Sequence, residues 1–176
     1  MKTKQLTVNA MLAAMCAVLG YLAIDLGAVK ITFETLPVIL AGLIYGPLSA
    51  VIVGGMGTFL YQILRYGFTV TTVLWMLPCM AAGLIAGICA KHSGYYNSKK
   101  QLAIITVVCE FAAFIFNTIA IYADAKIFGY FQPGLISGAI LVRFLIVLAK
   151  SVIYSIIMLP ILTSIAKYST IYLNLN

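Results

Sequence analysis

The sequence predicts an all-α integral membrane protein, a single bundle of six transmembrane helices over residues 1–176 with both termini in the cytoplasm. Hydrophobic residues make up 64% of the 176 residues and charged residues only 9%, and the mean hydropathy is +1.11. A soluble domain is roughly 45–50% apolar and about 25% charged. A chain of this length has too much surface to bury such an apolar excess, so the surplus is expected to face lipid.

Six apolar segments follow one another along the chain, and a spanning helix needs about 20 residues. The segments cover residues 6–24, 35–45, 48–66, 73–90, 102–122 and 135–166. The second is short and ends at Gly46-Pro47, a turn signal. Pro160 should kink or end the sixth helix because it lacks a backbone donor. Lysines before the first segment resemble a signal peptide, but further spans follow, so we expect a retained first helix.

The positions of the basic residues predict the orientation of the bundle. With the N-terminus in the cytoplasm, the inner ends and loops hold six basic residues and the outer loops hold three. The inner set is Lys2, Lys4, Lys91, Lys99, Lys100 and Lys167, and the outer set is Lys30, Arg65 and Lys126. Because cytoplasmic loops carry an excess of Lys and Arg, this asymmetry favours two cytoplasmic termini. It also explains the net charge of +7 without any nucleic-acid partner.

Three ionisable residues lie at membrane depth within the apolar segments, where a charge is costly and indicates function by default. At about 1.5 Å per residue, Glu110 and Lys150 reach nearly the same depth, so they can form a pair that is either structural or functional. Arg143 lies roughly 10–12 Å below the outer face, level with Asn117 and with no acidic residue to match it. Snorkelling could satisfy Arg143, but we favour an outward-facing cavity in which its planar fork binds an anionic or carbonyl-bearing ligand.

The connection between the third and fourth segments combines aromatic rings, hydroxyls, an amide and a cation at the outer surface. Tyr and Trp at an interface often form an aromatic belt. The amide, the cation and the hydroxyls of this connection would add nothing to a belt. Aromatic faces with a few convergent polar groups suit a planar heterocycle, and the loop 25–37 lies on the same side as a cover. The candidate substrate-binding residues are Glu34, Gln62, Arg65, Tyr66, Thr71, Thr72, Trp75, Asn117 and Arg143.

The sequence offers no visible catalytic or metal site. It contains no P-loop, HExxH or GxSxG motif, and the single histidine, His92, has no catalytic partner. The four cysteines lie in apolar runs and form no CxxC pair. We therefore expect no catalytic residue, no metal and no cofactor, and we do not expect an enzyme.

Small residues mark the first segment. Ala10, Ala13, Ala14 and Ala17 form two overlapping small-xxx-small patterns, which we expect on one face of the helix. Small residues let helices approach closely in lipid. The pattern serves either packing inside the bundle or the docking of another membrane protein.

Taken together, these features resemble the substrate-binding S components of energy-coupling factor (ECF) vitamin transporters over nearly the whole chain. The second helix of that family typically reads P-x-x-x-x-G-x-x-x-G-P, which is matched here by Pro37, Gly42, Gly46 and Pro47. The alanine-rich first segment and the glycine-rich third segment also match. The resemblance is strongest to the folate-type branch, in the run 37–47 and in Asn117-Thr118 followed by Arg143. The tract 66–75 departs from the folate pattern, so pantothenate, pyridoxine and hydroxymethylpyrimidine stay open as ligands.

The resemblance implies a multi-pass protein of a prokaryotic cell membrane that captures a small water-soluble vitamin at the outer face. It also implies partners, namely a transmembrane coupling subunit and two ATPase subunits of an ECF-type ABC importer, with docking through the alanine pattern. The lipid bilayer is the remaining partner. The alternative is a membrane interaction or assembly protein that does not transport and whose polar residues are purely structural.

Overall fold

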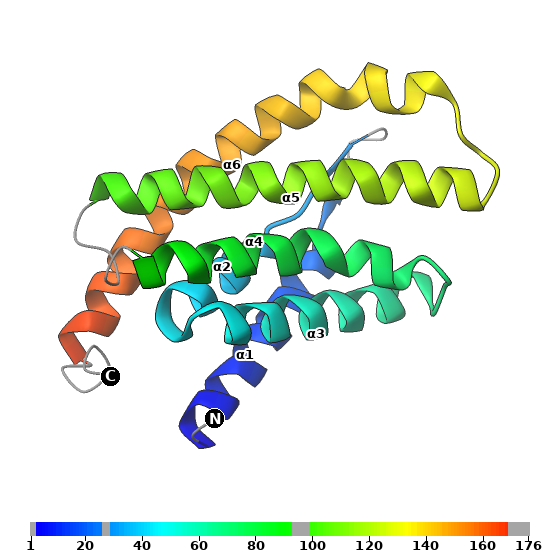
Figure 1. The fold of residues 1–176 in the computed structure, drawn as a ribbon. Coiled ribbons are helices and arrows are strands. Elements are labelled where there is room, and N and C mark those ends of the chain that lie inside the picture. The colour runs from blue at the N-terminus through cyan, green and yellow to red at the C-terminus, as the bar shows by residue number, and fades with distance from the viewer. Residues whose placement is uncertain (1–2, 26–28, 93–98, 169–176) are drawn as a thin grey trace.

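The computed structural model describes residues 3–25, 29–92 and 99–168, which form six α-helices and one small hairpin (Figure 1). In chain order the elements are α1 (Thr3–Tyr21), β1 (Ile24–Asp25), β2 (Lys30–Ile31), α2 (Thr35–Tyr45), α3 (Pro47–Tyr66), α4 (Thr72–His92), α5 (Lys99–Ile127) and α6 (Pro133–Tyr168). The six predicted helices are confirmed. Their bounds agree with the predicted segments to within a few residues, and the largest difference is at the end of α5.

Four of the described helices, α3 to α6, are long and apolar enough to cross a membrane. Helix α1 has 19 residues, whereas α2 has only 11. At 1.5 Å per residue, α2 extends about 17 Å, well short of a hydrocarbon layer of about 30 Å. The bundle therefore has six helices of which four or five can span the membrane, fewer than the six spans that the sequence suggested.

A tight turn ends α2 and begins α3. Gly46 has a φ of 87°, which glycine adopts without strain, and Pro47 occupies the first turn of α3, where its missing N–H has no helical partner to lose. The turn packs closely against α4. A Cβ built on Gly87 of α4 would lie only 2.3 Å from the Pro47 nitrogen, so no side chain fits between them. Small residues thus let the short helix lie deep in the bundle, in contact with α1, α3, α4 and α5.

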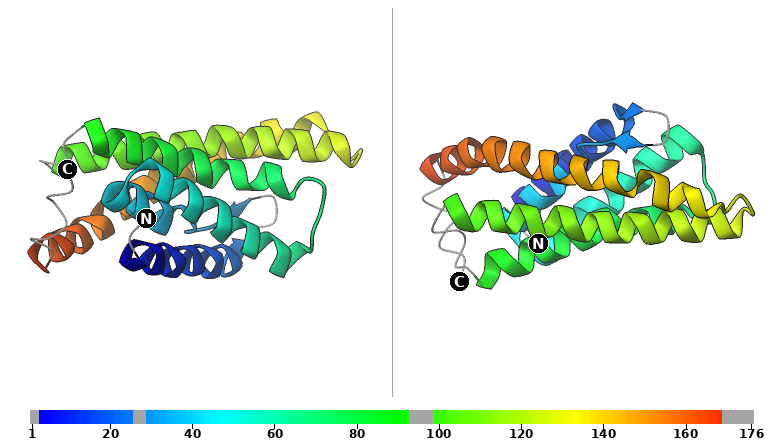
Figure 2. Two further views of the ribbon diagram at one scale, coloured as in Figure 1. Left: turned by 60° about the horizontal axis from the view of Figure 1, so that its bottom comes forward. Right: turned by 90° about the horizontal axis from the view of Figure 1, so that it is seen from above.

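The connections gather at two opposite ends of the bundle. Figures 1 and 2 show the start of α1 and the end of α6 at one end, and the α3–α4 and α5–α6 connections at the other. This is the arrangement that the predicted topology requires, although the direction across the membrane stays a prediction. Helix α6 packs on α5 and continues through Pro160 to its last turn, so this proline does not end the helix.

The segment before α2 forms a hairpin where the sequence suggested only a loop. Strands β1 and β2 pair antiparallel, with Ile24 opposite Ile31 and Asp25 opposite Lys30. The chain then runs through Glu34 into the first turn of α2. The hairpin thereby places charged side chains beside the space enclosed by the helices.

Candidate functional site

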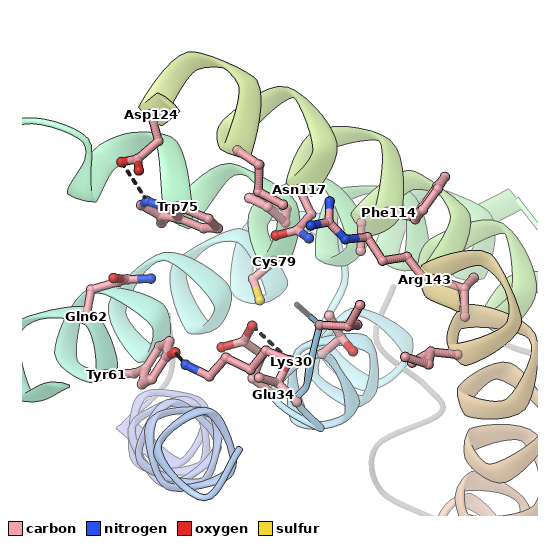
Figure 3. A pocket seen from close by; sticks show the side chains of 18 of the residues that line it. Lys30, Glu34, Tyr61, Gln62, Trp75, Cys79, Phe114, Asn117, Asp124 and Arg143 are labelled. Atoms are coloured by element: carbon pink, nitrogen blue, oxygen red, sulfur yellow. Dashed lines mark hydrogen bonds between the residues drawn. The ribbon is translucent and has the colours of Figure 1, made fainter. Parts of the chain in front are cut away.

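A cavity of about 650 Å³ lies inside the bundle, lined by residues from the hairpin segment and from α2 to α6. Figure 3 shows Tyr61 and Gln62 on α3, Trp75 on α4, Asn117 on α5 and Arg143 on α6 around this space. Small-molecule sites typically enclose about 300–1,000 Å³. The cavity therefore has the size of a ligand site and is built by several elements at once.

Seven of the nine predicted site residues line the cavity, namely Glu34, Gln62, Tyr66, Thr71, Trp75, Asn117 and Arg143. Arg65 and Thr72 do not. The Arg65 guanidinium forms an ion pair of 2.5 Å with Asp25 and donates to the carbonyl oxygen of Tyr21 at 2.8 Å. The Thr72 hydroxyl accepts the backbone N–H of Thr69 at 3.0 Å. These two residues therefore hold the surrounding chain in place.

A hydrogen-bonded group that we call the floor network consists of Thr35, Glu110, Lys150 and Tyr154. The Lys150 ammonium lies 2.8 Å from Glu110 Oε2, so the predicted pair forms. Thr35 donates its hydroxyl to Glu110 Oε1 at 2.5 Å and therefore accepts from the Tyr154 hydroxyl at 3.0 Å. Glu110 and Lys150 also line the cavity, although the sequence analysis did not include them among the site residues. Within the described ranges, no three His, Cys, Asp or Glu residues are grouped to hold a metal ion.

Three polar groups in the cavity wall lack a protein partner among the described residues. The Arg143 guanidinium and the Asn117 amide have no hydrogen bond or ion pair there, and Figure 3 shows both directed toward the cavity. Glu34 Oε2 is buried and has no hydrogen-bond partner. Leaving a buried polar group unpaired costs about 1–3 kcal/mol. Of the three groups Glu34 Oε2 is buried, whereas Asn117 and Arg143 are half-buried and line the cavity, so together they mark a candidate ligand site.

Lys30 binds two tyrosines at the edge of the cavity. Its ammonium donates to the hydroxyls of Tyr61 and Tyr66 and lies 4.9 Å from each ring centroid. The two rings meet edge to face at 6.1 Å. Lys30 was not among the predicted site residues, because in the sequence it shows only as one of the basic residues of the outer loops.

Trp75 is held by a carboxylate that the sequence analysis also missed. The indole N–H donates to Asp124 Oδ1 at 3.3 Å (Figure 3), and the Tyr130 hydroxyl donates to Oδ2 of the same residue. Burial of the Tyr130 hydroxyl, together with this bond, raises the pKa of Tyr130 to about 12. The two bonds fix the N–H edge of the indole while its ring lines the cavity.

Comparison with known proteins identifies the family. The family model described as "ECF transporter, substrate-specific component" matches residues 4–162, most of the chain. The chain belongs to this family. One solved structure, of the S component of a bacterial ECF transporter, has a TM-score of 0.65 at 20% sequence identity and covers 97% of this chain and 99% of its own. No curated protein matches. This S component is therefore a multi-pass membrane protein of a transport system and not an enzyme.

The four predicted docking residues of this S component differ in burial along one stripe of α1. Ala13 and Ala17 are buried, whereas Ala10 and Ala14 are exposed. The backbone at Ala13 packs closely on α3, since a Cβ at Gly57 would lie 2.9 Å from the Ala13 carbonyl oxygen. At about 100° per residue, the four alanines still share one stripe of α1, and Ala10 and Ala14 form its exposed edge.

Proposed function

We propose that this S component is the high-affinity vitamin-binding subunit of an ECF-type ABC importer and that a folate-like vitamin is its favoured cargo. It captures the vitamin at the outer face and delivers it through association with the ATP-driven ECF module, a transmembrane coupling subunit with two ATPases. The observation that carries this proposal is the cavity wall, where the Arg143 guanidinium, the Asn117 amide and Glu34 Oε2 have no partner among the described residues and the Trp75 ring lines the same space.

The chemistry of that wall favours folate over the other vitamins. A planar heterocycle suits the Trp75 ring, and a carboxylate or carbonyl suits the planar fork of Arg143. Folate carries both groups on one molecule. Pantothenate has no ring to place against Trp75, and pyridoxine and hydroxymethylpyrimidine have no anionic group for Arg143.

The position of the cavity is consistent with capture on one side and docking at α1. Asp124 and Phe128, at the end of α5 that leads into the α5–α6 connection, line it, and the predicted topology assigns that end to the outside. The exposed pair Ala10 and Ala14 lies on α1, away from the cavity lining. Docking through these two small residues would leave the cavity wall unchanged.

Ligand titration of the purified protein in detergent tests the proposal. Trp75 is the only tryptophan of the chain and lines the cavity, so its fluorescence reports occupancy directly. Folic acid, pantothenate, pyridoxine and hydroxymethylpyrimidine are compared, with calorimetry for any ligand that absorbs at the emission wavelength. We expect saturable binding, tightest for folic acid. If none of the four binds, the proposal is contradicted and the alternative of a non-transporting assembly protein gains support.

A further inference from the structure

The Glu34 carboxyl group occupies a position prepared for it at the edge of the cavity. Its Oε1 accepts the Thr32 hydroxyl at 3.2 Å, while its Oε2 is buried without a hydrogen-bond partner. A Cβ built on Gly20 would lie 2.8 Å from Oε2, so the bare backbone of α1 makes room for the carboxyl group there. Figure 3 shows Glu34 facing the same space as Cys79 and Arg143.

The charged groups around Glu34 are already engaged with other residues. The titratable side chains that face it from the packed elements are Lys30 on β2, Tyr61 on α3, Cys79 on α4, Glu110 on α5 and Lys150 on α6. Lys30 donates to two tyrosine hydroxyls, and Lys150 pairs with Glu110. Among the described residues Glu34 has no ion pair, and burial raises its pKa above the ordinary value.

We infer, on the basis of the proposed function, that Glu34 selects cargo of the aminopyrimidine class, a planar heteroaromatic ring with a neutral N–H donor edge. Glu34 binds that edge as a carboxylate. An ionised carboxyl group only accepts hydrogen bonds, so its free Oε2 calls for a donor. The donor is neutral because the charges that act on Glu34, those of Lys30, Lys150 and Glu110, already balance the charge of its carboxylate. The donor edge belongs to an aromatic ring because the Trp75 indole lines the same cavity.

This assignment fixes the sign of the pH dependence of binding. The pKa of Glu34 is raised in the free protein, and a donor bound to Oε2 stabilises the charged form and lowers that pKa. Binding then releases a proton, so affinity rises with pH through the free-state pKa, by no more than about tenfold per pH unit for one proton. A ligand that presents an acceptor would bind the protonated carboxyl group, and its affinity would fall as pH rises.

The test uses 2-amino-4-oxopteridine (pterin), the smallest folate fragment with such an edge. Its affinity for the full chain in detergent is measured by calorimetry between about pH 5 and about pH 8, over the range in which the absorption spectrum of the probe stays constant. Repeating the titration in two buffers of different ionisation enthalpy counts the protons released. For the parent protein we expect affinity to rise with pH and a proton to be released.

Two variants separate recognition by Glu34 from general effects. Glu34→Gln should lose the pH dependence and bind pterin about ten- to a hundredfold more weakly at the upper end of the range, because a hydrogen bond to a charged group is lost. Thr32→Val removes only the bond to Oε1, so the rise in affinity should persist and move to higher pH. Thermal unfolding of each variant checks its fold, and the parent profile tests the sign without any variant.

Three results would overturn the inference: no binding of pterin, affinity that falls as pH rises, or a pH dependence that Glu34→Gln leaves unchanged. These results are distinct from failure of the proposed function. If pantothenate or pyridoxine binds and pterin does not, the vitamin-binding function stands while the inference about Glu34 falls. If pterin binds with the expected pH dependence, both stand.

Discussion

Replacing Glu110 with glutamine removes the counter-charge of Lys150 inside the bundle. The two side chains are 1% and 12% exposed, and the Lys150 ammonium lies 2.8 Å from Glu110 Oε2. At an effective dielectric constant of about 20, this separation gives an attraction of about 6 kcal/mol, which offsets a desolvation cost of several kcal/mol per ion. Removing one partner of a buried pair costs about 3–5 kcal/mol, and we expect a loss of this size in Glu110→Gln.

Thermal unfolding in detergent, at one scan rate and without ligand, measures the effect. A chain of this length loses about 2–4 °C in Tm per kcal/mol, so Glu110→Gln should unfold about 6–20 °C below the parent. The control is the double variant Glu110→Gln/Lys150→Met, which removes both charges at similar volume and should unfold near the parent. The reasoning is refuted if the single variant matches the parent, or if the double variant is as unstable as the single one.

Three further predictions concern the ligand, the docking face and the orientation. Trp75→Ala removes a stacking surface worth about 1–3 kcal/mol, so calorimetry should show about ten- to hundredfold weaker folic acid binding, and an unchanged affinity would place the ring elsewhere. Ala14→Leu, at the exposed edge of α1, should abolish transport and co-purification with the coupling subunit, while ligand binding survives. Ala13→Leu, at the buried edge, should instead lower Tm. If Ala13→Leu abolishes co-purification and Ala14→Leu does not, docking uses the buried edge. Cysteines placed at Lys91 and Val70 in a cysteine-free background should label from opposite sides of the membrane, and labelling of both from outside would overturn the topology.

The helices could be predicted because the length of an apolar run and a local turn signal decide them. Gly46-Pro47 marked the boundary between α2 and α3 without any tertiary information. The end of α5 could not be placed in the same way, because Asp124 and Lys126 have the polarity of loop residues. In the folded chain Asp124 stays helical since Trp75 and Tyr130 satisfy its carboxylate, and neither partner is a sequence neighbour in the helix.

The sequence could predict how deep each site residue lies in the membrane, but not which side of its helix faces the cavity. Counting residues along α5 and α6 placed Glu110 level with Lys150, and these residues form the ion pair. Successive side chains on a helix point about 100° apart. Because Tyr66 lines the cavity, the side chain of Arg65 points away from it and pairs with Asp25. The residue Lys30 was missed because two-residue strands are too short to show the alternation that predicts a hairpin.

The most direct test of the central claim compares two arginines. Arg143 lines the cavity without a partner among the described residues, whereas Arg65 is paired with Asp25 outside the lining. We expect Arg143→Ala to weaken folic acid binding about ten- to a hundredfold, as the loss of a hydrogen bond to a charged group requires, and Arg65→Ala to leave the calorimetric affinity within about twofold of the parent. If Arg143→Ala binds folic acid as tightly as the parent, the cavity described here is not the vitamin site.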